Sequence, residues 1–281
     1  MLRMIFLYAL IPTFILYFCF KLRIKVLSKH LQPDFSIEFG SPIWDVRSNG
    51  RSIMITERNE EAQQVLFSLF DLASHTFQWE QVSFEEEWWV SLVYLGTDAA
   101  VFQTLNDTQD IESQSIFAID LHNQDMLWQQ AECRFVNALP KTIKLLSAAE
   151  ESFFVDLYSG DRTEEPKTLT STNPEVTYPA YFEEHLDHFQ TLKKFLARHI
   201  LEEPSGSFEY HQSDRFFVIS GNFKRETGYS NELFVFNTSG ELYLREVLDD
   251  QLGGLASGAF FIVDRQLIFV KRKKELLAYG I

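Results

Sequence analysis

The stretch IFAIDLHNQDMLWQQ, residues 116–130, repeats the pattern of LFSLFDLASHTFQWEQ, residues 66–81. In both stretches apolar residues lead into Asp-Leu, six further residues follow, and a Trp comes next. The two copies are offset by 49 residues, and the repeated positions are Asp71, Trp79, Asp120 and Trp128. An internal repeat of this length indicates an architecture built from similar small units.

Similar units recur along most of the chain. Each consists of three or four short runs rich in β-branched and aromatic residues, separated by polar turns, and 27 of the 281 residues are Phe. Repetition at about 40–50 residues with four strands per unit is typical of propeller blades. We therefore predict an all-β fold, a single β-propeller of about five four-stranded blades, with four or six blades as alternatives.

The repeated Trp residues have a physical role in such a fold. A blade is a small twisted sheet that cannot cover both of its faces, so neighbouring blades must stack. We predict that Trp79 and Trp128 fill the gaps between adjacent sheets, each contributing about 4–6 kcal/mol of gross burial free energy. Phe135 is predicted at the corresponding place of the third unit, and the adjacent Trp88 and Trp89 on opposite faces of one strand.

The two ends of the repeat region are expected to meet in one blade. The segment FSIEF, residues 35–39, alternates apolar and polar positions and can pair with the C-terminal LLAYGI or LIFVKRK strand. Joining the first and last strands in one sheet closes the ring and protects its edges.

One segment departs from the strand pattern. Residues 178–204 carry an apolar stripe at helical spacing, with Pro179 and Pro204 at its ends. Acidic residues come early in it and basic residues late, the order that the helix dipole favours. We predict a helical insertion around residues 180–202.

The IFAIDLHNQDMLWQ layout resembles the repeat of quinoprotein-like (PQQ-like) propellers, with Ile116, Phe117, Ala118, Ile119, Asp120 and Trp128 in matching places. Phe67, Leu69, Asp71 and Trp79 match more loosely, and the family's Thr-Gly turn is absent from both copies. The good match covers about a fifth of the chain. The cofactor-dependent members use a vicinal Cys pair, which this sequence lacks, so the resemblance implies a cofactor-free scaffold; an uncharacterised bacterial propeller family is a further possible match.

The N-terminus differs in character from the body. Residues 4–20 form an uncharged, mostly apolar run at the short end of a membrane span, and Lys21, Arg23, Lys25 and Lys29 follow it. The positive-inside rule then predicts one inner-membrane helix with the body cytoplasmic. The alternative is a soluble cytoplasmic protein whose translation starts near Val26 or Leu27. The predicted domains are 1–30, the apolar segment and basic flank, and 31–281, the propeller.

Composition limits the possible partners. The formal net charge of −15 repels phosphate backbones, so we expect no nucleic-acid binding. The only two cysteines, Cys19 and Cys133, give no disulfide framework. The sequence contains no glycine-rich phosphate loop, G-x-S-x-G elbow or HExxH motif, which argues against the common enzyme classes.

Four clusters could carry chemistry, each with a structural alternative. His185 and His188 with Glu184 or Asp187 could begin a metal site or form a solvated helix face. FEEEWW, residues 84–89, could bind a cation or sugar or be a solvated turn. Asp156, Asp161 and Glu164 could hold calcium or lie in an ordinary loop. KRKK, residues 271–274, could touch anionic lipid or protect an edge strand. The structural alternative is preferred for all four, so no metal or cofactor is assigned.

Two functions remain open at this point. The favoured one is a non-enzymatic binding or scaffolding module that grips an unknown protein or small ligand at the propeller mouth. The alternative is a metal-dependent hydrolase or lactonase-like propeller, because the fold alone does not decide function.

Overall fold

The computed structural model describes residues 31–139, 141–166 and 176–281. The predicted membrane segment, residues 4–20, lies outside these ranges. Within them, no helix is both long and apolar enough to cross a membrane.

The described residues form five antiparallel sheets, here called the first to fifth sheets. The first sheet holds β2 (Ile43–Ser48), β3 (Ser52–Asn59), β4 (Gln64–Asp71) and β5 (Thr76–Val82). The second holds β6 (Val90–Leu95), β7 (Ala99–Asp107), β8 (Asp110–Asp120) and β9 (Met126–Ala131). The third holds β10 (Cys133–Leu139), β11 (Thr142–Ser147), β12 (Ser152–Asp156) and β13 (Arg162–Thr163).

The last two sheets have one extra short strand each. The fourth sheet has the order β15 (Ala180–Glu183), β16 (Pro204–Gln212), β17 (Phe216–Lys224), β18 (Tyr229–Asn237) and β19 (Leu242–Leu252). The fifth has the order β14 (Val176–Thr177), β20 (Phe260–Val263), β21 (Gln266–Lys271), β22 (Glu275–Gly280) and β1 (Phe35–Glu38). The predicted pairing of the N-terminal and C-terminal strands is confirmed, since Phe35 pairs with Ala278.

One backbone hydrogen bond shows that all five sheets are copies of one unit. Apart from the short strands β14 and β15, each sheet has four main strands, counted in the order given above. In each sheet, the residue after the third main strand donates its N–H to a carbonyl in the turn between the first two main strands. The five bonds are Leu72 to Arg51, Leu121 to Asp98, Leu157 to Lys141, Thr238 to Arg215 and Ile281 to Arg265. The chain is therefore a β-propeller of about five blade-like sheets, as the sequence predicts.

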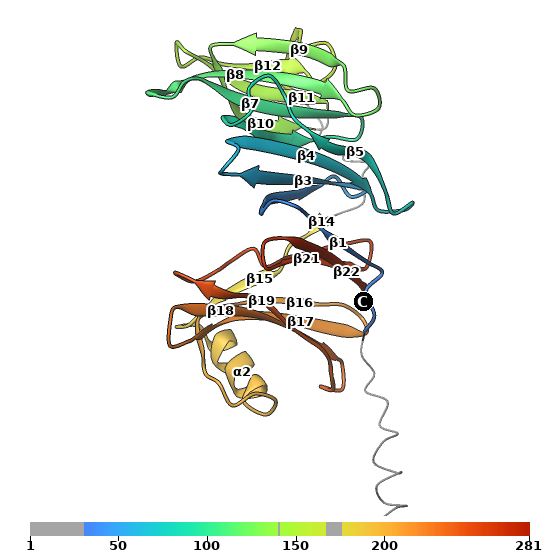
Figure 1. The fold of residues 1–281 in the computed structure, drawn as a ribbon, viewed down its shortest axis with the longest axis vertical. Helices are drawn as coiled ribbons and strands as arrows, with labels where there is room; N and C mark the ends of the chain where they lie inside the picture. The colour runs from blue at the N-terminus through green and yellow to red at the C-terminus, as the bar shows by residue number, and fades with distance from the viewer. Residues whose placement is uncertain (1–30, 140, 167–175) are drawn as a thin grey trace, which may run out of the picture.

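The sheets stack in an arc through buried apolar clusters. Separate clusters join the third sheet to the second, the second to the first, the first to the fifth, and the fifth to the fourth. In the parts of the chain that the structure describes, no such cluster joins the third sheet to the fourth. Figure 1 shows these two sheets at opposite ends of the long axis. The ring is therefore open at this point, although the strand pairing that was expected to close it is present.

An equivalent position in the last main strand of each sheet explains both the stacking and the gap. We call it the inter-sheet position; it pairs with the residue two before the end of the third main strand. Its occupants are Trp79, Trp128, Thr163, Leu244 and Phe35 in the first to fifth sheets. Four are large and apolar, whereas Thr163 in the third sheet is small and exposed. The third sheet, which has no large residue here, is the one with no following sheet packed on it in the described residues.

Three predicted placements are corrected by the structure. Phe135 lies in β10, the first strand of its sheet, and so does not replace Trp. Trp88 and Trp89 precede β6, because the side chain of Glu86 accepts both of their backbone N–H groups and holds them in a turn. KRKK lies at the end of β21 and in the following turn, within a sheet rather than on its edge.

The helical insertion is shorter than predicted. Helix α2 spans Asp187–Leu196, with Asp187 in its first turn and Lys193 and Lys194 in its last. Residues 180–183 pair with β16 instead, so tertiary pairing overrides the helical pattern there. Phe189 and Leu196 bury the apolar stripe against Phe rings on the outer face of the fourth sheet. The helix thus covers the face that would meet the third sheet in a closed ring.

Candidate functional site

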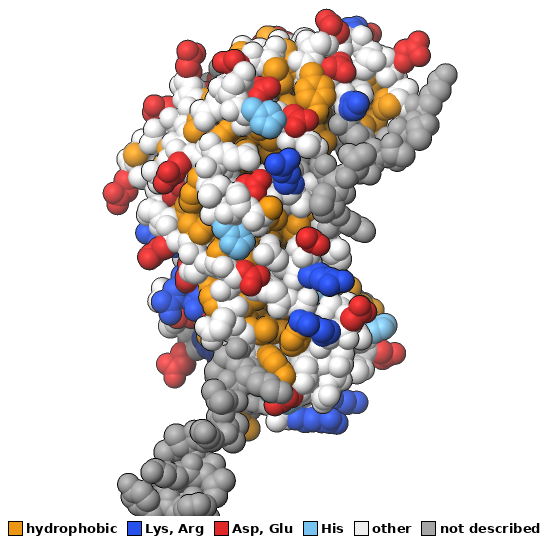
Figure 2. Space-filling view, turned by 90° about the vertical axis from the view of Figure 1, so that its right-hand side faces the viewer, with side chains coloured by type: hydrophobic (Ala, Val, Ile, Leu, Met, Phe, Trp, Pro, Cys, Tyr) orange, Lys and Arg blue, Asp and Glu red, His pale blue; other side chains and the backbone are white. Residues whose placement is uncertain are grey.

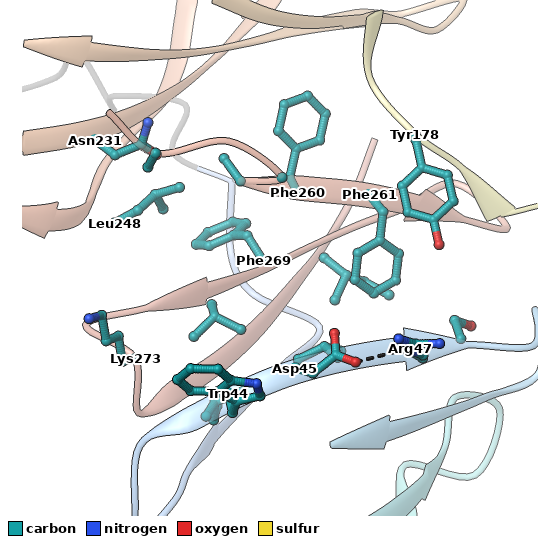
Figure 3. A pocket seen from close by; sticks show the side chains of 18 of the residues that line it. Trp44, Asp45, Arg47, Tyr178, Asn231, Leu248, Phe260, Phe261, Phe269 and Lys273 are labelled. Atoms are coloured by element: carbon teal, nitrogen blue, oxygen red, sulfur yellow. Dashed lines mark hydrogen bonds and ion pairs between the residues drawn. The ribbon is translucent and has the colours of Figure 1, made fainter. Parts of the chain in front are cut away.

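A cavity of about 680 Å³ is lined by residues of the first, second, fourth and fifth sheets. All six residues of β2 line it, together with Val93–Leu95 of β6 and Ala259–Phe261 around the start of β20. Figure 3 shows β2 running along one side, with Phe260 and Phe261 on the opposite side. A volume in this range is typical of small-molecule and peptide sites.

The walls of the cavity are mainly apolar and aromatic. Phe260, Phe261 and Phe269 come from the fifth sheet, and Tyr178, which follows β14, lies 6.3 Å from Phe261 between ring centroids. Trp44 and Tyr178 are 68% and 67% exposed, although large aromatic side chains are usually well buried. Such exposed rings offer apolar surface that a ligand can cover.

Few charged groups reach the cavity, and two of them neutralise each other. Asp45 accepts a hydrogen bond of 2.8 Å from Arg47 Nε. Arg47 also donates through Nη1 to the carbonyl oxygen of Val93, which ties β2 to β6. Lys273 lies at the end of the cavity away from Arg47 (Figure 3), and Asp249 also lines the cavity. The arrangement favours a ligand that is largely apolar.

A buried polar network fixes the glycine-rich wall, residues 253–259. The carboxylate of Glu209 accepts the backbone N–H groups of Gly258 and Ala259. Asn222 accepts the N–H of Ala256 and donates to its carbonyl oxygen. Asn231, which lines the cavity, donates to Asn222. The fourth sheet therefore holds this loop in a preformed position, which lowers the ordering cost of binding.

A fully buried carboxyl group lies behind the β2 wall. Glu57 pairs with Ile43, and its Oε1 accepts the N–H of Ser41. Burial raises the pKa of Glu57, and the bond from Ser41, the side chain of Gln81 and the charge of Lys274 offset this in part. Its Oε2 has no partner with hydrogen-bond geometry in the described chain.

The four repeat residues predicted from the sequence are structural and lie outside the cavity. Asp71 and Asp120 each end a strand and accept two backbone N–H groups from the following turn. Trp79 and Trp128 are buried between sheets. Asp156 accepts the two equivalent N–H groups in the third sheet. This residue, which was a candidate calcium ligand, therefore stabilises a turn.

The other candidate clusters are dispersed. His185 precedes α2, and its Nδ1 lies 3.3 Å from a carboxylate oxygen of Glu183, whereas His188 lies on α2 and stacks on Phe182 at 4.8 Å. Lys271 pairs with Glu246, and Lys274 donates to the carbonyl of Gly40. No group of three or more metal-ligating side chains occurs in the described ranges.

The cavity residues were not singled out by sequence reasoning. They come from β2, β6, the segment after β14, and β20, which are far apart in the chain. Trp44 of β2 is exposed in the structure, and this exposure could not be read from the sequence IWDVRS, residues 43–48. The surface is mixed in charge: Figure 2 shows acidic groups mostly in the upper half of one face and Lys and Arg mostly in the lower half.

Comparisons with known proteins assign this chain neither a family nor an activity. A family model described as a domain of unknown function, DUF4905, matches residues 47–128, less than a third of the chain. No curated protein matches the sequence closely enough to count as a relative.

Several solved structures are remotely similar. The β-propeller domain of the Trilobed protease from Pyrococcus furiosus, described as having an open velcro topology, is 10% identical, with a TM-score of 0.36, covering 88% of this chain and 94% of that one. A DUF4221 member from Bacteroides vulgatus is 8% identical, with a TM-score of 0.31 and coverage of 90% and 98%. The N-terminal domain of Nup159 is 11% identical, with a TM-score of 0.30 and coverage of 85% and 76%. None of these likenesses carries a function to this chain.

Proposed function

We propose that the protein is a non-enzymatic binding module that holds its ligand in the cavity lined by the first, second, fourth and fifth sheets. The observation that carries this proposal is the cavity itself, which combines about 680 Å³, aromatic walls and a loop fixed by buried hydrogen bonds. Preformed, mostly apolar cavities with a few convergent polar groups are the usual ligand sites of proteins.

Site-specific photo-crosslinking tests the proposal without knowledge of the ligand. A photoreactive phenylalanine analogue replaces Phe261 in the cavity, and the control carries it at Val136, which is exposed on the third sheet. After irradiation in cells, we expect a discrete adduct by mass spectrometry at position 261 and none at position 136. Equal adducts at both positions, or none at either, would overturn the proposal.

Metal analysis and activity assays on the purified full chain test the enzyme alternative. Stoichiometric zinc or calcium in the purified full chain, together with metal-dependent hydrolysis of an ester or lactone, would replace the binding proposal with that of a metal-dependent propeller enzyme. An adduct at position 261 that forms equally after chelation supports the binding module.

We also propose that the repeats are of the quinoprotein-like type in its cofactor-free, scaffold form. Three turns support this, because Asp71, Asp120 and Asp156 make equivalent hydrogen bonds to the residues two and three positions ahead. Trp79 and Trp128 hold equivalent inter-sheet positions. The support is the shared geometry of the repeat and extends to no cofactor.

The localisation proposal rests on sequence alone. We propose that residues 4–20 anchor the protein in the inner membrane, with the sheets on the cytoplasmic side. Expression of the full gene with a C-terminal tag tests it: the tag is expected in the membrane fraction and resistant to protease in intact spheroplasts. A soluble product whose first peptide begins near Val26 would instead support the alternative of a soluble protein whose translation starts near Val26 or Leu27.

A further inference from the structure

The wall formed by β2 is the edge of a sheet. Successive side chains of a strand point to opposite faces, so a cavity against a face touches every second residue. All six consecutive residues of β2 line this cavity, and β2 is the terminal strand of the first sheet. The backbone edge of β2 therefore faces the cavity. The N–H of Ile43 already donates to the carbonyl oxygen of Lys273, which leaves the outward groups of residues 44–48 for a ligand.

The chain itself places an extended segment beside this cavity. Val176 and Thr177 form β14, which adds to β20 by pairing with Val263 and Ile262. β14 pairs only with the last two residues of β20. Phe260 and Phe261, the first two residues of β20, line the cavity and do not pair with β14. The fold thus already adds one strand, β14, to the inner edge of the fifth sheet, which packs next to the first sheet.

The dimensions and side chains of the cavity suit a second such segment. Residues 44–48 of β2 extend over about 16 Å at ~3.3 Å per residue, enough for a short strand. Figure 3 places the exposed ring of Trp44 at one end of this edge and that of Tyr178 toward the other, with Phe261 facing β2. Alternate side chains of an added strand would therefore meet aromatic surface.

We propose that the ligand of this cavity is an extended peptide segment of another polypeptide, which adds as a strand to the inner edge of β2. Its apolar or aromatic side chains, at alternate positions, cover Trp44, Phe261 and Tyr178. The mixed and mutually paired charges of the cavity favour such a segment over a highly charged one. The inference rests on the proposed function, because it names the ligand class of the same cavity.

The first experiment selects a peptide and then tests its backbone. A phage-displayed random peptide library is panned on the full chain, and the best binder is resynthesised with a single N-methyl group at each position in turn. N-methylation removes one donor and leaves the side chains in place. Strand addition predicts a loss of about tenfold in affinity at every second position and little change between them, since tenfold corresponds to ~1.4 kcal/mol.

The second experiment locates the binding. Trp44→Ala and Phe261→Ala are each expected to weaken the selected peptide about tenfold or more, whereas Trp89→Ala, an exposed Trp outside the cavity, leaves affinity unchanged. Hydrogen exchange of the backbone amides of residues 43–48 is expected to slow when the peptide binds. Exchange rates in β11 residues 142–147, in the third sheet and outside the cavity lining, serve as the control.

The outcomes separate the two proposals. A peptide that depends on Phe261 but shows no alternating N-methyl pattern overturns strand addition and leaves the binding module standing. If no peptide is selected from the library and the crosslinked adduct at position 261 is not a peptide, strand addition is overturned and the binding module again stands. Peptides that bind equally well to the Phe261→Ala and Trp44→Ala variants overturn the cavity as the site and with it both proposals.

Discussion

The indole Nε1 of Trp79, in the first sheet, donates a hydrogen bond of 2.8 Å to the carbonyl oxygen of Leu121, in the second. Trp128 makes the same bond, also of 2.8 Å, to Leu157 in the third sheet. Leu121 and Leu157 each follow the Asp that ends the third strand of their sheets. The repeated Trp of one unit thus binds the repeated turn of the next, so burial and hydrogen bonding act at the same point.

The first prediction concerns this bond. Trp79→Phe and Trp128→Phe retain an aromatic ring but leave a buried carbonyl oxygen without its donor, which costs about 1–3 kcal/mol in addition to lost packing. We expect each variant to lower the urea midpoint at an unchanged m value. Trp89→Phe, at an exposed position, should change the unfolding free energy by less than about 0.5 kcal/mol. Equal effects at all three positions would contradict the assigned role.

The second prediction tests the open arc. Leu244 and Thr163 occupy the same inter-sheet position in the fourth and third sheets, and only Leu244 is buried. Leu244→Ala should cost about 2–5 kcal/mol of unfolding free energy, because it creates a cavity between two sheets. Thr163→Ala should fall within about 0.5 kcal/mol. A large cost for Thr163→Ala would mean that the third sheet packs on another surface in solution.

Much of this fold was predictable from local pattern. The spacing of Asp71 and Trp79 repeats at Asp120 and Trp128 because each pair serves the same turn and the same gap. Pairing of residues 35–38 with the C-terminus followed from the alternation of apolar and polar residues. The gap between the third and fourth sheets was not predicted. It lies where the inter-sheet position holds the small Thr163, in β13, a strand of only two residues that has no recognisable period.

The candidate site was not predictable in the same way. Its walls come from the edges of β2 and β6, from Tyr178 and from Phe261, and edge positions have no characteristic spacing in sequence. The start of the helix was misplaced for a related reason: residues 180–183 read as helical but gain more by pairing with residues 207–210. Both errors arise where tertiary pairing decides the local structure.

The third prediction concerns the turn carboxylate of Asp71. Hydrogen bonds from the backbone N–H and hydroxyl of Ser74 and from the N–H of Ala73, with the charge of Arg51, outweigh burial and lower its pKa. Asp71→Ala should cost about 1–2 kcal/mol at neutral pH, and Asp71→Asn less, because the amide oxygen still accepts.

The pH dependence of Asp71→Asn checks the cause. A carboxyl whose pKa is lower in the folded state stabilises the protein above its unfolded pKa, here 3.8, and loses that contribution as the pH falls through the folded pKa. The stability difference between wild type and Asp71→Asn should therefore shrink on acidification below about pH 4.

The fourth prediction has the opposite sign and concerns Glu57. Burial raises the pKa of this carboxyl from its ordinary value of 4.5, so the folded state favours the protonated form. The favourable contribution is complete below pH 4.5 and is lost as the pH rises through the folded pKa. Glu57→Gln keeps an oxygen that accepts the N–H of Ser41 and carries no charge at any pH.

Glu57→Gln should therefore be more stable than the wild type at neutral pH, and the two curves should converge as the pH falls toward 4.5. Denaturant unfolding of both proteins between these pH values measures the difference directly. If Glu57→Gln were less stable than the wild type at neutral pH, the attraction between the carboxylate and Lys274 would outweigh burial. Lys274→Gln would then destabilise the wild type but leave Glu57→Gln unchanged, whereas dominance of burial predicts a small effect of Lys274→Gln in both.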